Sequence, residues 1–425
     1  MPNILDQVRS DFRTFAQRSF NSVDALILCE LSYINMPKSI PLYNSESKVI
    51  STTPIYDLLR FEDFSSMFSS GVAKVDKFRQ ELLFAVAANP RYRGIKVGEI
   101  LERFDKSNAH ESCEQQFAGV TFDLSSCEGI DNPNTIVVAF RGTDNTLVGW
   151  KEDFNMAFRC PIPAQESAAE YLISVTQRYS KYIAKKASLL QKISSFFAKS
   201  TNSKRDNCDN NNKRDNNNKR DNNNKRNNSP NIIVTGHSKG GNMASYATMR
   251  LDAENEKLGN LVSKIYSMDG PGFANDVVDT SVFSCVASRI EKVVPQSSII
   301  GLLMDNGLPY KVARADSVGL MQHFGMYWHV EDGDFDYRDE VTARAAAIAK
   351  AMNSWMFDLP VEERKRRIDS VYNVLSSLGY PTFDLLGSHW SELVPKLLGM
   401  ATHLDAKSYE LIRGIIAAVA GVGVK

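Results

Sequence analysis

Hydrophobic and polar positions change their spacing along the chain, and each change predicts a different kind of element. In the first hundred residues apolar side chains recur at helical spacing, for example in VDALILCELSYI from Val23 and KFRQELLFAVAAN from Lys77. From about Gln115 the period shortens to two in QFAGVTFDLSS, and a DNPN turn separates this segment from the apolar run TIVVAF. We therefore expect a helical N-terminal region, residues 1–110, followed by two strands joined by a turn.

The rest of the chain alternates strand patterns with helix patterns. A long helical segment covers about residues 168–199, and beyond it NIIVTG, SKIYSMDG, RIEKVVPQ and YKVARAD have the length and apolar content of buried strands. Alternation of this kind builds a mostly parallel sheet covered by helices. The sequence thus predicts an α/β core over residues 111–335. Only helical patterns of useful length follow, so residues 336–425 are expected to form a helical C-terminal extension, packed on the sheet or over its site.

One stretch, residues 203–228, has no hydrophobic period. It is a degenerate repeat of Lys-Arg-Asp-Asn-Asn-Asn in which the one apolar side chain is Cys208. Such a segment cannot bury enough surface to offset its ordering entropy, so we expect a disordered spacer. Nucleic-acid binding is not expected, because Asp and amides dilute the basic pairs and no aromatic residue is interleaved. The repeat enters the sheet opposite the carboxyl ends of the strands, where sites lie, and should be dispensable for chemistry.

Composition narrows the class of protein further. The chain has 50 basic and 50 acidic residues, so no overall electrostatic field attracts nucleic acid or an anionic membrane. Any charged partner would have to be recognised by a local surface. The N-terminus lacks the basic start and apolar run of a secretory signal, and the longest uncharged apolar stretch, IIAAVAGVGV, falls short of the roughly 20 residues of a spanning helix. The six cysteines show no metal-ligand spacing. We expect reduced thiols, no metal and a cytoplasmic protein.

The clearest chemical motif is NIIVTGHSKGGNMA, in which an apolar strand runs through GHSKG into a predicted helix. Glycine at Gly236 and Gly240 lets the strand and the helix approach without a Cβ clash, and the turn forces Ser238 into a strained backbone conformation that presents its hydroxyl. A plain Gly/Ser turn is the other interpretation. The preceding strand, the following helix and the third glycine, Gly241, argue against it. We predict that Ser238 is the nucleophile of an α/β-hydrolase fold.

A second motif lies upstream in VVAFRGTDNTLVGWKEDF. Here FRGT occupies the carboxyl end of a predicted strand, and the Trp-x-x-Asp pair, Trp150 and Asp153, follows shortly after. The order FRGT…WxxD and then GHSxGG resembles class 3 lipases and a related, largely uncharacterised bacterial family of α/β-hydrolases. The resemblance covers about residues 115–328.

This resemblance implies an oxyanion hole. Thr143 would contribute its backbone N–H, with its hydroxyl as a further donor, and Lys239 would contribute its backbone N–H; removing one such donor typically lowers the rate about a hundredfold or more. For Arg141 and Trp150 we favour structural roles, in which Arg141 braces the loop and Trp150 packs beneath it.

The base should follow the nucleophile, because the hydrolase chain order runs from serine to acid to histidine. The candidates are His323, His329, His389 and His403. His323 follows the last predicted strand by a loop, and its surroundings, QHFGMYW, resemble the histidine segment of the lipase-like family, so it is preferred and His329 is the alternative. The other two lie in the helical extension. His110 is expected at the surface, and His237 is expected to point away from Ser238 without a chemical role.

The acid is less clear from the sequence. The carboxylates near predicted strand ends between nucleophile and base are Asp269, Glu291, Asp305 and Asp316. Asp269 begins the turn DGPGF after the strand next to the nucleophile strand, which resembles the aspartate turn of pancreatic-type lipases. Class 3 lipases usually carry the acid one strand later, in Asp-x-Val-Pro, but here Lys292 occupies the aspartate's place in EKVVP. We prefer Asp269, leave Asp305 and Glu291 open, and expect Asp316 to cap a loop.

Two classes of function follow. The first is a serine hydrolase that forms an acyl-enzyme on Ser238, with no metal or organic cofactor. By resemblance its substrate would be a moderately apolar acyl ester or lipid, while thioesterase, acyltransferase and peptidase activities remain open. The second is an inactive α/β-hydrolase fold that serves as a binding or scaffold module, which the missing Asp-x-Val-Pro acid supports. Between acid and base, PQSSIIGLLMDNGLPY either lines an acyl pocket, forms a lid or belongs to the core.

Overall fold

The computed structural model describes most of the chain in detail. The described residues are 1–105, 115–144, 147–201 and 229–377, without 275, 279, 306 and 318, together with positions 395, 399, 406 and 409. The expected spacer, residues 203–228, and most of the chain beyond 377 lie outside them. Within the described ranges, no helix combines the length and the apolar content needed to cross a bilayer.

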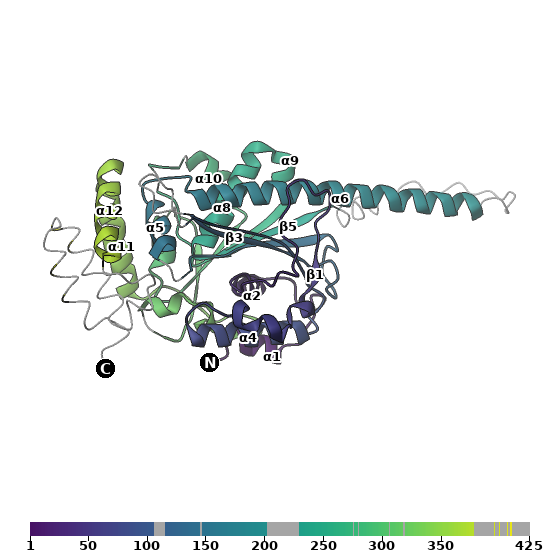
Figure 1. Ribbon diagram of the computed structural model, residues 1–425, viewed down its shortest axis with the longest axis horizontal. Coiled ribbons are helices and arrows are strands. Elements are labelled where there is room, and N and C mark those ends of the chain that lie inside the picture. Colours follow the sequence, from purple (N-terminus) through teal and green to yellow (C-terminus); the bar gives the residue numbers. More distant parts are fainter. Residues whose placement is uncertain are drawn as a thin grey trace.

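A nine-stranded sheet forms the centre of the molecule (Figure 1). Four successive pairings from the fourth to the eighth strand are parallel, whereas the strands at both edges pair antiparallel. In spatial order the strands are β1 (Thr53–Pro54), β2 (Lys96–Asp105), β3 (Gln115–Asp123), β4 (Thr135–Phe140), β5 (Asn231–His237), β6 (Val262–Met268), β7 (Ile290–Pro295), β8 (Tyr310–Ala313) and β11 (Tyr337–Arg338). A separate hairpin joins β9 (Val330–Glu331) and β10 (Asp334–Phe335).

Helices cover both faces of this sheet. Because both faces are covered, β4 is buried at every position: Val137 and Ala139 belong to one hydrophobic core, and Ile136, Val138 and Phe140 to the other. The α-helices are α1 (Ile4–Ser10), α2 (Ser22–Ser32), α3 (Phe64–Met67), α4 (Ala73–Ala88), α5 (Leu147–Asn155), α6 (Pro163–Thr201), α8 (Lys239–Glu254), α9 (Glu256–Gly259), α10 (Thr280–Ala287), α11 (Ala343–Phe357) and α12 (Val361–Ser376). Short 3₁₀ helices cover Ile55–Leu58, Phe61–Asp63, Ile300–Leu302, Gly319–His323 and Gly325–Tyr327. This is the α/β-hydrolase fold that the sequence predicts.

The N-terminal region differs from the expected all-helical segment. Its two long helices, α2 and α4, are present as predicted, but β2 adds a ten-residue strand that pairs antiparallel with β3. A bulge between Gly98 and Leu101 shifts the register of this pairing, so residues 96–105 lack a clean period of two. The expectation of a purely helical region was wrong because the alternation that marks a strand is interrupted there.

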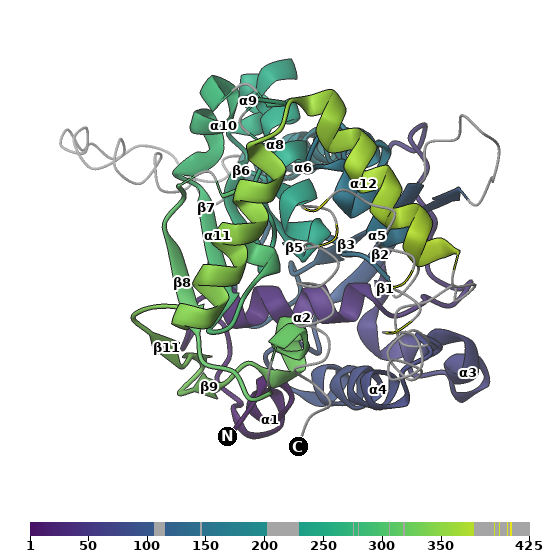
Figure 2. The same ribbon diagram turned by 90° about the vertical axis from the view of Figure 1, so that its left-hand side faces the viewer.

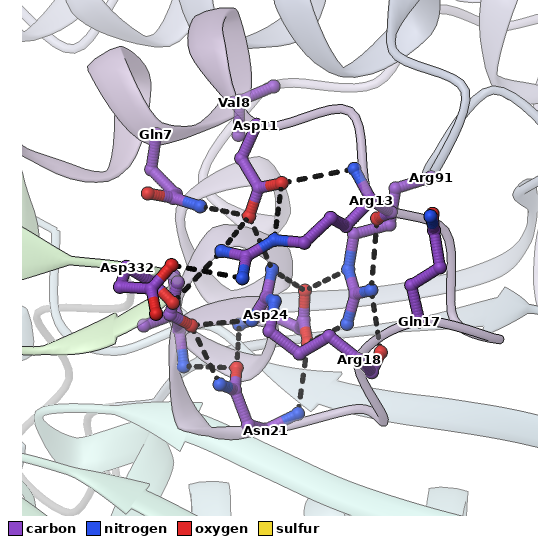
Figure 3. A network of polar contacts seen from close by, with 12 residues as sticks. Gln7, Val8, Asp11, Arg13, Gln17, Arg18, Asn21, Asp24, Arg91 and Asp332 are labelled. Atoms are coloured by element: carbon purple, nitrogen blue, oxygen red, sulfur yellow. Dashed lines mark hydrogen bonds and ion pairs between the residues drawn. The ribbon is translucent and has the colours of Figure 1, made fainter.

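A buried polar network fixes the segment before α2 to the rest of the region (Figure 3). The Arg91 guanidinium donates to both carboxylate oxygens of Asp24, at 2.8 and 2.7 Å, and to the carbonyl oxygens of Arg18 and Ser19. The side chains of Arg91 and Asp24 are almost fully buried. Since Asp24 lies in the first turn of α2, this network anchors the start of the helix that crosses the sheet.

The described part of the predicted C-terminal extension begins with β11, which pairs with β8 at the edge of the central sheet, and continues with α11 and α12 (Figure 2). The expectation of a purely helical segment from residue 336 was therefore wrong at its start, because two residues are too short to leave a strand pattern in the sequence. Helix α12 packs against α5, where Lys151 and Asp369 form an ion pair. The buried Arg364 of α12 donates to Asp276 at 2.7 Å and to the carbonyl oxygen of Ala157. These contacts hold α12 against α5 and against the segments that carry Ala157 and Asp276.

Candidate active site

Ser238 lies at the sharp turn between β5 and α8. Its backbone has φ 60° and ψ −132°, a left-handed conformation that is strained for a residue with a side chain. The serine directly precedes the helix, so the first N–H groups of α8, which have no partner within the helix, lie beside it. The side chain is buried rather than freely solvated.

Close backbone packing around the turn requires glycine. A Cβ at Gly236 would lie 2.1 Å from the backbone of Gly240, and one at Gly240 would lie 2.2 Å from the carbonyl oxygen of Phe140. A Cβ at Gly142 would meet the carbonyl oxygen of His237 at 2.4 Å and the Cβ of Ser238 at 2.9 Å. The FRGT loop is therefore pressed directly against the serine turn, so both motifs form one site.

The imidazole of His323 lies against the carboxylate of Asp269. His323 Nδ1 and Asp269 Oδ2 are 2.6 Å apart, and the Asp269 side chain is 1% exposed. Asp269 follows β6 directly and has φ 49°, a left-handed backbone that aspartate tolerates better than most residues. The structure thus brings together the preferred base and the preferred acid.

Two residues that the sequence analysis did not single out hold this carboxylate. Asp269 Oδ1 accepts hydrogen bonds from the Ser298 hydroxyl at 2.5 Å and from the Gly301 N–H at 3.1 Å. A Cβ at Gly301 would lie 2.3 Å from that oxygen. Both belong to the segment between acid and base, so this part of PQSSIIGLLMDNGLPY supports the acid. In the sequence, the pair Ser297–Ser298 shortly before Gly301 was the signal that could have indicated this role.

The alternative acids have other partners. Glu291 forms ion pairs with Lys264 and Lys311, both at 2.9 Å. Asp305 accepts the N–H of Gly307 at 3.1 Å within its own turn. Asp316 contacts His329, the alternative base, at 2.9 Å, and also the N-terminal amine. His110, His389 and His403 lie outside the described residues.

His237 is nearer to the chemistry than the sequence suggests. Its Nε2 is 2.7 Å from the carbonyl oxygen of His323, its ring centroid is 4.5 Å from that of His323, and its Nδ1 is 3.0 Å from the Tyr33 hydroxyl. Burial lowers the pKa of His237 well below its usual value, so the ring is neutral. Since a carbonyl can only accept, Nε2 carries the proton and Nδ1 accepts from Tyr33. His237 therefore anchors the backbone of His323, while no direct hydrogen bond joins Ser238 to the His323 ring within the described residues.

The side chain of Lys239 turns away from the serine into the protein. Its Nζ is fully buried and lies 2.8 Å from Glu152 Oε2 and 3.0 Å from the carbonyl oxygen of Gln116. Burial alone would lower the pKa of Lys239, but Glu152 and Asp153 raise it overall, so the ammonium stays charged. Only the backbone of Lys239 is therefore free to act at the serine.

Asp153 joins this lysine to the FRGT loop. Its Oδ1 is 3.6 Å from Lys239 Nζ, and its Oδ2 accepts the Thr143 hydroxyl at 2.5 Å. Burial raises the pKa of Asp153 to about 6, although Lys239 and Thr143 act in the opposite direction. Asp153 was only a motif residue in the sequence analysis, and here it fixes the side chain of a predicted oxyanion residue.

Arg141 braces distant segments, as a structural role requires. Its guanidinium donates to the carbonyl oxygen of Ser32 at the end of α2 and to Glu102 of β2, both at 2.8 Å. Trp150 has its ring 6.3 Å from that of Phe154 on the same helix. Arg141 thus holds α2, and with it Tyr33, against the sheet.

The fold and the serine turn define a lipase-like α/β-hydrolase. Comparison with known families agrees, since the Mbeg1-like family model matches residues 86–188 and 216–373, more than half of the chain. The chain belongs to the Mbeg1-like family.

Two solved structures are similar at low identity. Lipase II from Rhizopus niveus is 14% identical, with 69% of this chain and 91% of that chain covered and a TM-score of 0.30. A lipase from Rhizopus microsporus var. chinensis is 14% identical, with 66% and 82% covered and a TM-score of 0.28. No curated protein matches the sequence.

Proposed function

We propose that the protein is a serine hydrolase that cleaves an ester or related acyl bond. The observation that carries this proposal is the 2.6 Å contact between His323 and Asp269 beside a strained serine turn. In the first step Ser238 Oγ attacks the acyl carbon while His323 takes the hydroxyl proton. His323 then gives that proton to the leaving alkoxide, and water hydrolyses the acyl-enzyme by the same route. Asp269 holds the Nδ1–H tautomer and stabilises the imidazolium.

The backbone N–H groups of Thr143 and Lys239 are the proposed oxyanion donors. The Thr143 hydroxyl donates to Asp153, so we assign the oxyanion role to its backbone N–H. The close approach of Gly142 to Ser238 supports this assignment, because it brings the FRGT loop within reach of the serine. Such donors stabilise the charge that develops on the carbonyl oxygen in the transition state.

We further propose an acyl ester of moderate apolarity, of the carboxylesterase or lipase type, as the substrate. Support comes from the FRGT…WxxD and GHSxGG motifs, which resemble those of class 3 lipases. None of the proposed catalytic steps needs a metal or an organic cofactor, since the nucleophile, base and acid are all side chains of this chain.

Labelling with a fluorophosphonate probe tests the proposal. The folded protein should be labelled and should hydrolyse p-nitrophenyl esters, and Ser238→Ala should abolish both. Ser370→Ala, which removes a hydroxyl on α12 that donates to the backbone of its own helix, is the matched control and should keep both activities. Absence of labelling and turnover in folded wild-type protein would contradict the proposal and favour the scaffold function.

A further inference from the structure

Helix α6 continues well beyond the sheet that it covers. Residues Tyr171, Leu172 and Val175 are buried against the core, and Ile183 is the last buried side chain that the structure describes on this helix. Every described side chain after it on this helix, up to Ile193, is exposed. Figure 1 shows this second half of α6 projecting past the other labelled elements. The described side chains from 184 to 193 thus contribute nothing to the core.

Large apolar side chains nevertheless occupy this projecting part. Leu189 and Leu190 are each 58% exposed, Ile193 is 44% exposed and Tyr182 is 40% exposed. At 100° per residue, positions 182, 189 and 193 fall on one side of the helix, and position 190 lies next to them. Together they form an apolar face, defined here as Tyr182, Leu189, Leu190 and Ile193, that would be costly to leave in water.

The same helix is strongly basic, although the whole chain is neutral. The sequence has no acidic residue between Glu170 and Asp206, while α6 carries six basic residues after Glu170. Arg178 is engaged by Glu99 at 2.8 Å. The lysines at 181, 185, 186 and 192 are exposed. At the same spacing Lys185 and Lys192 fall beside the apolar face, whereas Lys186 falls on it, between Ile193 and Leu190. The charges nearest to this face on its own helix are therefore positive, since α6 has no acidic residue after Glu170.

We propose that the projecting half of α6 is a docking surface for an anionic phospholipid bilayer. A basic amphipathic helix lies in the interface with its apolar face among the acyl chains and its lysines at the anionic headgroups. A second copy of this chain fits less well, because pairing two projecting halves of α6, which carry lysines and no acidic residue, brings like charges together. Nucleic acid fits less well too, since leucine and isoleucine gain nothing at a phosphate backbone. This proposal does not depend on the proposed hydrolase activity.

Vesicle flotation with the full chain tests the proposal. The protein should float with vesicles of phosphatidylcholine plus phosphatidylserine, should not float with phosphatidylcholine alone, and should be released by salt. Lys185→Glu with Lys192→Glu should weaken binding at least about tenfold, and so should Leu189→Glu with Leu190→Glu. All four positions are exposed, so the variants keep the fold, which circular dichroism checks.

Matched controls place the same changes elsewhere on the surface. Lys257→Glu with Lys365→Glu, and Leu42→Glu at a side chain that is 77% exposed, should bind as wild type does. Ester turnover of the α6 variants should be unchanged, which separates this result from a failure of the hydrolase proposal. Equal binding to both vesicle types, or no binding to either, would overturn the inference. Two other results would also overturn it. One is a wild-type dimer that the α6 substitutions dissociate, and the other is nucleic-acid binding without vesicle binding that these substitutions abolish.

Discussion

At the scale of single residues, the candidate site depends on side chains that hold other side chains. Asp269 orients His323, Ser298 and Gly301 hold Asp269, and His237 holds the His323 backbone. Each contact replaces water around a buried polar group, so the loss of one partner leaves the other unsatisfied. The geometry of the proposed base is therefore set by residues that take no part in proton transfer.

Tyr33→Phe tests the positioning role of His237. The substitution leaves the buried Nδ1 of His237 without its donor, at a cost of about 1–3 kcal/mol in the free energy of unfolding. We expect kcat for a p-nitrophenyl ester to fall about tenfold with little change in KM, because the displaced group positions the base rather than the substrate. Tyr56→Phe, at a 55% exposed ring, is the control. A loss of stability with unchanged kcat would contradict the positioning role.

Asp153→Asn tests the raised pKa of Asp153. Its pKa increases from 3.8 to about 6 on folding, so the folded state retains the proton more strongly. The resulting stability is present below about pH 4 and is lost as the pH rises through 6, and a difference of about two pKa units corresponds to about 3 kcal/mol. Relative to wild type, Asp153→Asn should therefore gain stability to urea between about pH 4 and pH 7. Parallel pH curves for the two proteins would contradict this.

At the scale of elements, α2 connects the N-terminal region to the site. The buried Arg91–Asp24 pair anchors the first turn of α2, and the Arg141 guanidinium donates to a carbonyl oxygen of its last turn. Tyr33 follows directly after this helix. Helix α2 also contacts β3 to β6 across the sheet. The position of Tyr33, and so of His237, thus depends on a helix that is fixed at both ends.

Arg91→Met should be strongly destabilising. Removing the guanidinium leaves the buried Asp24 carboxylate with the Tyr92 hydroxyl and a 3.9 Å contact to Arg18 as its remaining side-chain partners outside α2's own cap, and breaking a buried pair typically costs about 3–5 kcal/mol. Arg9→Met is the matched control, because Arg9 pairs with Glu81 at the surface and should contribute less than about 1 kcal/mol. Urea unfolding measures both, and similar losses in the two variants would contradict the role assigned to the buried pair.

At the scale of the whole molecule, the candidate active site and the basic half of α6 lie at separate places. The serine turn and its partners lie at the carboxyl ends of β5 and β6, whereas the chain from α6 returns to the start of β5 at the opposite edge. The chain as a whole is neutral, but α6 is locally basic. A membrane contact at α6 would therefore leave the serine site free.

Deletion of residues 204–228 tests this separation. Because the repeat precedes β5 at the edge away from Ser238, we expect ester turnover to stay within a few fold of the parent protein. The measurement is the steady-state rate on a p-nitrophenyl ester, with folding checked by thermal unfolding. A large loss of turnover in a folded variant would show that the repeat is near the site.

The sequence by itself determined the fold class and the sharp turn at Ser238, because both depend on local patterns. Strand length, helical spacing and the glycines around Ser238 are properties of short segments, and β3 to β8 follow them. Only β2 was missed among the long strands, where a bulge disrupts the pattern.

Tertiary structure decided which groups surround that serine. The sequence left Glu291 and Asp305 open beside Asp269, and among the described residues Asp269 is the one of the three that contacts His323; its role as the acid stays a prediction. It assigned no role to His237, whose partner Tyr33 is 204 residues away in the chain. Hydrogen bonds between distant residues leave no periodic trace in a sequence, since only the folded sheet brings their donors and acceptors within 3 Å of one another.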